Sequence, residues 1–259
     1  MKPRFAIASY SFHGLHKLGA MTLVQYFETL RYRYGLTNAD IWNYMITSYE
    51  DEHLTMLRNE MDERDLKLAN LCCDGAHLWN DDASDTEQCD LMAQNVLKAG
   101  RILRAESVRI DLGIKSLQAT DEQIEICAKK YDAYCAIAAE YGAKLGPENH
   151  WGASTDIGVM KKLFQAVKAD NFAMLLHMGN WQCETVQERN ACDVEMVSRS
   201  MHIHMHYEAC VDADALFPAL VKAGYPGVWS VESHKSTNEY RNVAFQLAQA
   251  RRVIAPYEY

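Results

Sequence analysis

The sequence predicts a (β/α)8 barrel, because short apolar runs alternate with helix-like segments eight times along its 259 residues. One such barrel needs roughly 250 residues. No change in composition, linker or internal repeat divides the chain. An open doubly wound sheet would be expected to carry G-x-G-x-x-G after its first strand, and the chain has no such motif. We therefore expect residues 1–259 to form one α/β barrel domain.

Four strand–helix units are predicted in the first half of the chain. The helices are indicated by apolar residues at helical spacing, such as Leu54, Leu57 and Met61, and two of them end at a glycine, Gly35 or Gly142. The expected strands are Phe5–Phe12, Ala39–Trp42, Lys67–Cys73 and Ser107–Leu112. The expected helices are Leu23–Tyr34, Glu52–Glu63, Asp85–Arg104 and Asp121–Tyr141.

The second half repeats this order more clearly. Its expected strands are Ala143–Glu148, Phe172–Leu176, Ser200–Met205 and Gly227–Glu232. Its expected helices lie near Ile157–Lys168, Cys183–Val197, Ala213–Ala223 and Glu239–Ile254. Strands that alternate with helices of this length form βαβ units, so the sheet is expected to be parallel.

Composition narrows the class of protein. The net charge of −9 argues against a nucleic-acid surface, which would need a basic stripe. No run of about 18 apolar residues could span a membrane, and residues 1–12 are too short and polar for a signal peptide. The eight cysteines form no C-x-x-C pair, so we expect buried, reduced thiols and a cytoplasmic protein.

Polar residues end the last four predicted strands and suggest a metal site. These residues are Glu148, His177, His204 and Glu232. Any one of them alone could be a solvated charge or a hydrogen-bonded structural residue. Buried Glu and His at adjacent strand ends are costly unless they bind a metal or pair, and catalytic residues of such barrels collect at these ends. His202 lies one pleat deeper, so we expect it inside the barrel or behind the ligands.

The motifs at these strand ends resemble those of the xylose isomerase-like TIM-barrel superfamily of sugar-phosphate isomerases and epimerases, and the resemblance extends over essentially the full length. The matching motifs are Glu148-Asn149-His150, Gly179-Asn180, His202-x-His204 and Glu232. The resemblance implies one divalent metal held by Glu148, His177, His204 and Glu232. Two departures stand out. Many relatives carry Asp in place of His177, so the site here is less negative by one charge. Many also carry Lys in place of His206, and the absence of that Lys argues against a phosphorylated substrate.

The ligand types suit Mn²⁺, with Zn²⁺, Co²⁺, Fe²⁺ or Mg²⁺ as alternatives. The metal would act as a Lewis acid that stabilises an enediolate, while Glu148 and Glu232 remove and return a proton. The predicted function is therefore a metal-dependent isomerase or epimerase of a sugar or keto-sugar. The expected partner is a small sugar or glycoside, with no nucleic acid and no membrane. The sequence leaves homo-oligomerisation or a small partner subunit open.

His150 supports an alternative function. It shares a face with Glu148, and members of the superfamily that resemble this chain at Glu-Asn-His act as lyases on 3-keto-glycosides, C-glycoside deglycosidases among them. There a base removes the proton beside the ketone and the aglycone leaves. An endonuclease IV-like hydrolase is a remote alternative, because it would need three metals and a basic groove. The residues that could line a substrate pocket are His13, Trp42, His77, Trp79, Arg109, Trp151, His206 and His234. Trp151 directly follows the ligand strand and is the best candidate for stacking on a sugar ring.

Overall fold

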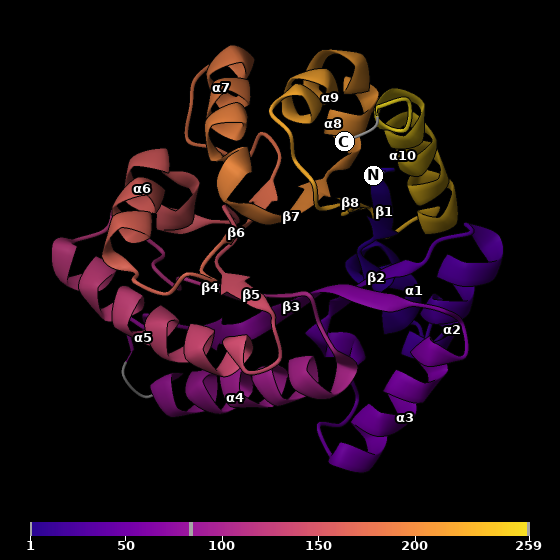
Figure 1. The fold of residues 1–259 in the computed structure, drawn as a ribbon, viewed down its shortest axis with the longest axis horizontal. Coiled ribbons are helices and arrows are strands. Elements are labelled where there is room, and N and C mark those ends of the chain that lie inside the picture. Colours follow the sequence, from indigo (N-terminus) through magenta and orange to yellow (C-terminus); the bar gives the residue numbers. More distant parts are fainter. Residues whose placement is uncertain (1, 83–84, 258–259) are drawn as a thin grey trace.

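The computed structural model describes residues 2–82 and 85–257, and within them parallel strands close into the predicted barrel (Figure 1). The strands are β1 (Arg4–Ile7), β2 (Asn38–Trp42), β3 (Lys67–His77), β4 (Ser107–Asp111), β5 (Lys144–Gly146), β6 (Met174–His177), β7 (Ser200–Met205) and β8 (Val228–Val231). They pair in the orders β1-β8-β7-β6 and β2-β3-β4-β5. Parallel bridges from Ala8 to Asp40 and from Glu148 to Leu175 join the two ladders on both sides. The α/β barrel prediction is confirmed.

Helices surround the barrel on its outer face (Figure 1). They are α1 (His13–Lys17), α2 (Leu23–Glu28), α3 (Asp51–Asp62), α4 (Thr86–Leu103), α5 (Asp121–Ala139), α6 (Ile157–Ala166), α7 (Val186–Met196), α8 (Tyr207–Val211), α9 (Ala213–Lys222) and α10 (Glu239–Ile254). A π-helical segment, Thr29–Arg33, extends α2. Capping boxes at Thr22, Thr120 and Thr185 begin α2, α5 and α7, since each side chain accepts a hydrogen bond from the third helical residue.

Several predicted boundaries were wrong for local reasons. The first strand ends at Ile7 and not at Phe12, because Ser9–Phe12 forms a 3-10 turn in which the Ser11 amide donates to the Ala8 carbonyl. The fifth strand stops at Gly146 and not at Glu148, where Pro147 has no N–H to donate to the ladder. The short helices α1 and α8 were missed because five residues show no clear helical period.

Other boundaries moved by a few residues. The third strand runs on past Cys73 to His77 with an irregular register, and the sixth is shifted to Met174–His177. Helix α7 begins at Val186 and not at the predicted Cys183, because the Thr185 capping box starts it. The seventh strand and the last helix agree with their predicted bounds.

Strand alternation gives the barrel a polar interior near its carboxyl end. Apolar side chains such as Ile41 and Ile203 are buried and belong to the main hydrophobic cluster. Their neighbours Asp40, His202 and His204 are buried too, and they contact one another across the barrel. The polar residues at the strand ends therefore stand on a hydrogen-bonded polar layer.

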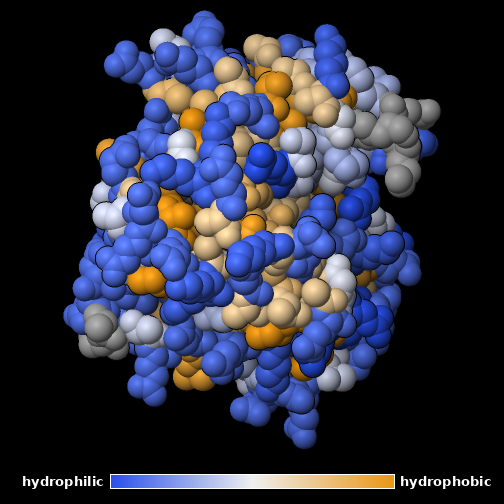
Figure 2. All heavy atoms as spheres, turned by 60° about the vertical axis from the view of Figure 1, so that its left-hand side comes forward, coloured by the Kyte–Doolittle hydropathy of each residue, from blue (hydrophilic) through white to orange (hydrophobic). Residues whose placement is uncertain are grey.

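Hydrophilic residues cover most of the face drawn in Figure 2, with hydrophobic residues in small groups between them. Within the described part of the chain, no helix combines the length and apolarity needed to cross a bilayer.

Candidate metal centre

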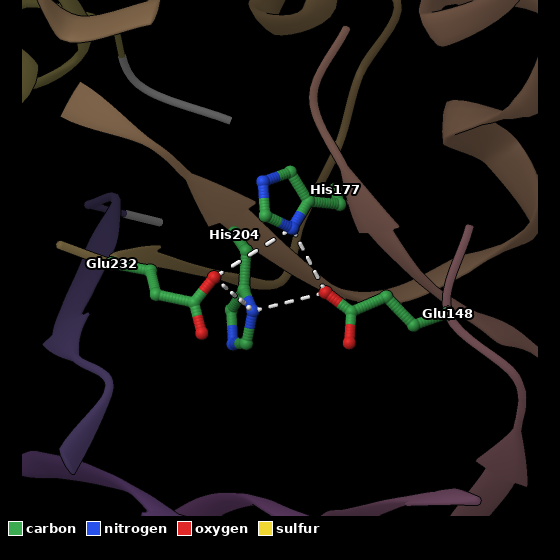
Figure 3. A group of neighbouring side chains, drawn as sticks. All are labelled: Glu148, His177, His204 and Glu232. Atoms are coloured by element: carbon green, nitrogen blue, oxygen red, sulfur yellow. Dashed lines mark hydrogen bonds and ion pairs between the residues drawn. The ribbon is translucent and has the colours of Figure 1, made fainter. Parts of the chain in front are cut away.

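Four side chains meet at the carboxyl end of the barrel, as Figure 3 shows. Nδ1 of His177 lies 3.0 Å from Oε1 of Glu148 and 3.6 Å from Oε2 of Glu232. Nδ1 of His204 lies 3.3 Å from each of the same two oxygens. All four residues are buried, and their potential ligand atoms lie within 4.8 Å of one another. The structure thus brings together the four residues that the sequence proposed as ligands.

Each of these four side chains lies at or just after the carboxyl end of a strand. His177 is the last residue of β6 and pairs in register with His204 of β7, while Glu232 directly follows β8. Glu148 follows β5 by two residues and bridges to β6. Gly146 lets β6 come this close, because a Cβ at that position would lie 1.7 Å from the Ala173 carbonyl oxygen.

Two asparagines hold the loops that carry these residues. The Asn149 side chain donates to the His177 carbonyl at 2.8 Å and accepts from the His177 amide at 2.7 Å. The Asn180 side chain donates to the carbonyls of Asn149 and His150 at 2.6 and 2.7 Å. The Glu-Asn-His and Gly-Asn motifs are therefore one hydrogen-bonded unit that fixes Glu148 relative to His177.

Asp40 determines the orientation of His204. Its Oδ2 lies 2.9 Å from Nε2 of both His202 and His204, and it accepts a 2.6 Å hydrogen bond from the Ser230 hydroxyl. Asn70 donates to the other oxygen at 3.0 Å. Burial alone would raise the pKa of Asp40, but the two imidazoles outweigh it and hold that pKa well below its usual range. An ionised Asp40 places the proton of His204 on Nε2 and directs Nδ1 toward the centre.

The geometry around His204 suits a cation. Its buried Nδ1 makes no hydrogen bond among the described residues, and it faces the oxygens of Glu148 and Glu232. Without a cation the pKa of His204 is well above its usual range, because Glu232 and Asp40 outweigh the opposing effect of burial. Two ligands of one metal ion lie roughly 3–4.4 Å apart, so contacts of 3.0–3.6 Å fit a shared ion. Two carboxylates and two imidazoles suit Mn²⁺ or Zn²⁺.

Arg109 holds the outer oxygen of Glu148. Its Nε lies 3.1 Å from Oε2 of Glu148, while Nη1 contacts Asp74 at 2.8 Å and Asp111 at 3.1 Å. The guanidinium is buried among these carboxylates. Burial would lower the pKa of Arg109, but the carboxylates, Asp111 foremost, raise it well above its usual range. Arg109 therefore leaves Oε1 of Glu148 free to face the histidines.

His150 forms a pair with Asp111 beside the centre. Its Nδ1 lies 3.1 Å from Oδ2 of Asp111, and its side chain is 34% exposed. Burial would lower the pKa of His150, but Glu148 and Asp111 raise it to about 9. This pairing orients the ring of His150 and leaves its Nε2 without a hydrogen-bond partner among the described residues.

Two cavities open at the centre. The inner pocket has a volume of about 150 Å³, and its walls include Tyr10, Trp42, Asp74, Arg109, His204 and Glu232. The outer cavity has a volume of about 460 Å³, and its walls include His177, Gly179, Asn180, His206, Glu208 and Lys235. His150 and His234 line both cavities.

The predicted substrate-binding residues divide into two groups. Arg109, His206 and His234 line the cavities, although the guanidinium of Arg109 is already engaged by carboxylates. His13, His77 and Trp151 do not line either cavity. His13 stacks on Tyr10 at 4.6 Å, and His77 packs edge-on against Trp151 at 5.3 Å. A substrate role for these three residues stays a prediction.

Sequence reasoning missed Asp40 and Asp111. Asp40 lies within the buried strand Asn38–Trp42, and a charged residue there is a signal that could have been used. Asp111 ends β4 two residues after Arg109, on the same strand face. Asp40 faces His202 and His204, and Asp111 pairs with His150 as well as with Arg109, so the contacts to these histidines could not be read from local patterns.

Comparison with known proteins gives one family and many similar structures. A family model described as a xylose isomerase-like TIM barrel matches residues 33–256. No curated protein matches the chain. The fold is similar to 3-keto-D-glucoside 4-epimerase YcjR from E. coli, with a TM-score of 0.75, 11% identity, and coverage of 97% of this chain and 99% of that one.

Two further structures are similar to this chain. D-psicose 3-epimerase from Clostridium cellulolyticum H10, solved with D-tagatose, has a TM-score of 0.73 and 14% identity, with coverage of 98% of this chain and 99% of that one. The IolI protein, solved with a zinc atom, has a TM-score of 0.73 and 15% identity, with coverage of 100% and 99%. At these identities the likeness establishes the fold alone.

Proposed function

Because the chain belongs to the xylose isomerase-like TIM barrel family, we propose that it is a metal-dependent isomerase or epimerase of an unphosphorylated keto-sugar. The observation that carries this proposal is the convergence of Glu148, His177, His204 and Glu232 at the mouth of the barrel. The similar structures support it, because they include epimerases of 3-keto-glucoside and of D-psicose.

The four side chains would hold the ion, and we propose Mn²⁺. A divalent ion held there supplies Lewis acidity to a carbonyl oxygen and its neighbouring hydroxyl. Glu148 and Glu232 approach from opposite sides of the two imidazoles (Figure 3), so one can remove a proton from the substrate carbon while the other returns it. Burial would raise the pKa of Glu148, but His150 and Arg109 outweigh it and keep that pKa well below its usual range, and Arg109 also holds the outer oxygen of Glu148 in place.

The charges of the cavity walls favour an uncharged substrate. Arg109 is surrounded by Asp74, Asp111 and Glu148, so its charge is already balanced. Lys235 lies over the Tyr207 ring, 3.6 Å from its centroid. Among its described lining residues the inner pocket has the carboxylates Asp74 and Glu232 and no lysine, so it offers no ammonium group to a phosphate.

Deuterium uptake from heavy water into unmodified keto-sugars tests this function. We expect exchange at the carbon beside the carbonyl with the Mn²⁺-loaded protein, and its loss after chelation. Glu148→Gln and Glu232→Gln should each slow exchange by about 10²-fold or more. Glu125→Gln, on the exposed side of α5, is the matched control. Exchange that continues in fully metal-free protein would refute the proposed mechanism.

The pairing of His150 with Asp111 favours a second candidate function. In its neutral form, which is populated as the pH approaches the raised pKa of about 9, the oriented imidazole of His150 could remove the proton next to the ketone of a 3-keto-glycoside and start β-elimination of the aglycone. Aglycone release from a 3-keto-glycoside, measured by chromatography, tests this alternative. Release that is lost in His150→Ala would support the lyase. Deuterium exchange that survives the same substitution would support the isomerase or epimerase.

A further inference from the structure

We propose that Cys183 and Cys192 form a reversible redox pair, whose disulfide fixes the loop between β6 and α7 onto α7. Their Sγ atoms lie 3.7 Å apart in the reduced protein, with Cys183 in the loop and Cys192 within the helix. The two sulfurs of a disulfide lie about 2.05 Å apart, so the bond forms after a movement of less than about 2 Å. This modification site is independent of the proposed function.

The two cysteines differ from the others in their exposure. Cys183 and Cys192 are only half-buried, so a small oxidant can reach them. Disulfides that form in a reducing compartment are usually transient and sense the redox state. The buried cysteines, whose thiols act as small apolar groups, are Cys72, Cys73, Cys89, Cys127, Cys135 and Cys210.

The environment of Cys192 determines which sulfur reacts first. Burial raises the pKa of Cys192 to about 12, and its hydrogen bond with Cys183 adds to this effect. Cys192 therefore keeps its proton near pH 7, and the first attack falls to Cys183.

A small disulfide such as oxidised glutathione supplies the oxidation. The Cys183 thiolate attacks one of its sulfurs, which forms a mixed disulfide and releases one glutathione thiolate. The Cys192 sulfur then attacks the Cys183 sulfur, and the second glutathione leaves with the bonding electrons and takes up the proton of Cys192. The two protein thiols lose two electrons, and oxidised glutathione gains them as it becomes two glutathione thiols. An excess of dithiol reverses the exchange.

The loop already contacts α7 on both sides of Cys183. Nη1 of Arg189 in α7 donates to the Cys183 carbonyl at 2.9 Å. Asp193 in α7 accepts hydrogen bonds from the Gly179 amide and from Nε1 of Trp181. A disulfide at Cys183 therefore strengthens the present position of the loop and does not impose a new one.

The same loop supports the candidate metal centre. Asn180 donates to the carbonyls of Asn149 and His150, and Gly179 and Asn180 line the outer cavity. Oxidation at Cys183 would thus make one wall of this cavity more rigid, because the loop could no longer separate from α7.

Oxidation with glutathione disulfide, followed by alkylation and tryptic digestion, tests the pair. Trypsin cleaves after Arg189, so Cys183 and Cys192 fall on separate peptides, residues 169–189 and 190–199. We expect mass spectrometry to find these two peptides linked after oxidation and separate again after treatment with dithiothreitol.

Single variants test the order of the two steps. Cys192→Ser should retain one glutathione on Cys183, because no second thiol displaces it. Cys183→Ser should take up at least tenfold less glutathione at Cys192. Cys89→Ser, which removes a buried thiol elsewhere, should form the linked peptides as the wild type does.

Two measurements on metal-free protein test whether the loop is fixed. The disulfide closes a loop of about ten residues, so oxidation should raise the midpoint of thermal unfolding by about 5 °C. Amide hydrogen exchange in residues 178–185 should slow at least threefold, because opening of the loop is restricted. Neither change should occur in Cys183→Ser.

The outcomes separate the two parts of the inference. If an excess of glutathione disulfide links no peptides in folded wild-type protein, the two thiols only pack against each other and the redox pair is overturned. Linked peptides with an unchanged melting midpoint and unchanged exchange would overturn the fixing of the loop. Neither result bears on the proposed function.

Discussion

Oδ2 of Asp40 lies 2.9 Å from Nε2 of His204, on the side of the ring opposite the candidate metal centre. A carboxylate that fixes the tautomer of a ligating histidine typically changes metal affinity 10–100-fold. We therefore expect Asp40→Asn to weaken Mn²⁺ or Zn²⁺ binding by about that factor, because the amide no longer holds the proton of His204 on Nε2. Titration calorimetry on chelator-treated protein measures the change.

The matched control for this substitution is Asp214→Asn, which removes an exposed carboxylate paired with Arg252. It should leave the dissociation constant of the metal unchanged. A folded Asp40→Asn variant with wild-type metal affinity would show that Asp40 does not position His204. Circular dichroism and thermal melting establish whether the variant is folded.

His177→Asp should change which metal the site prefers. Imidazole suits Zn²⁺, whereas a carboxylate suits Mn²⁺ and Mg²⁺, and the substitution converts a set of two nitrogens and two oxygens into one nitrogen and three oxygens. We expect the ratio of the Zn²⁺ and Mn²⁺ dissociation constants to shift at least tenfold toward Mn²⁺. Competition with a metal-sensitive dye measures both constants. His53→Asp, away from the centre, should leave the ratio unchanged, and the same ratio in both variants would mean that His177 is not a ligand.

The sequence was sufficient to predict the barrel and the convergence of Glu148, His177, His204 and Glu232. The parallel strands of a barrel place their carboxyl ends at the same end of the barrel. Residues at these strand ends are therefore expected to lie close to one another. The family resemblance then suggested which of these residues share one ion. This reasoning needs only the order of strands and the side of each strand that a residue occupies.

The supporting contacts could not be predicted in the same way. Asp40 reaches His202 and His204 across the interior of the barrel, over more than 160 positions of the sequence. Arg109 was expected to bind substrate, yet three carboxylates from or just after three separate strands already surround it. Such contacts depend on strand register and barrel closure, which periodicity does not determine.

Replacing Arg109 should strongly destabilise the metal-free protein. Arg109→Met would leave Asp74, Asp111 and Glu148 buried or half-buried without their shared cation. Breaking such a buried pair typically costs about 3–5 kcal/mol of unfolding free energy. Urea denaturation in the presence of a chelator measures the loss. Arg252→Met, which breaks an exposed ion pair, should have a far smaller effect. Equal stabilities of the two variants would contradict the structural role of Arg109.

Asp193 should make the stability of the protein depend on pH near neutrality. It is buried on α7, where it accepts hydrogen bonds from the Gly179 amide and from Nε1 of Trp181. Burial raises the pKa of Asp193 to about 7, and these hydrogen bonds only partly oppose that effect. Between about pH 4 and pH 7 the folded protein therefore retains a proton that the unfolded chain has lost.

The free energy of unfolding should consequently fall as pH rises from about 4 through 7, by an amount on the order of 2–4 kcal/mol from this group. The side chain of the Asp193→Asn variant cannot titrate. Between pH 5 and pH 8, the unfolding free energy of the wild type should therefore fall relative to that of the variant. Urea denaturation of chelator-treated protein at the two pH values measures this double difference. In Asp214→Asn the corresponding difference should stay constant, because Arg252 lowers the pKa of Asp214 and its titration lies below this range. Parallel pH profiles of wild type and Asp193→Asn would mean that Asp193 is ionised in the folded protein throughout, and that its hydrogen bonds outweigh its burial.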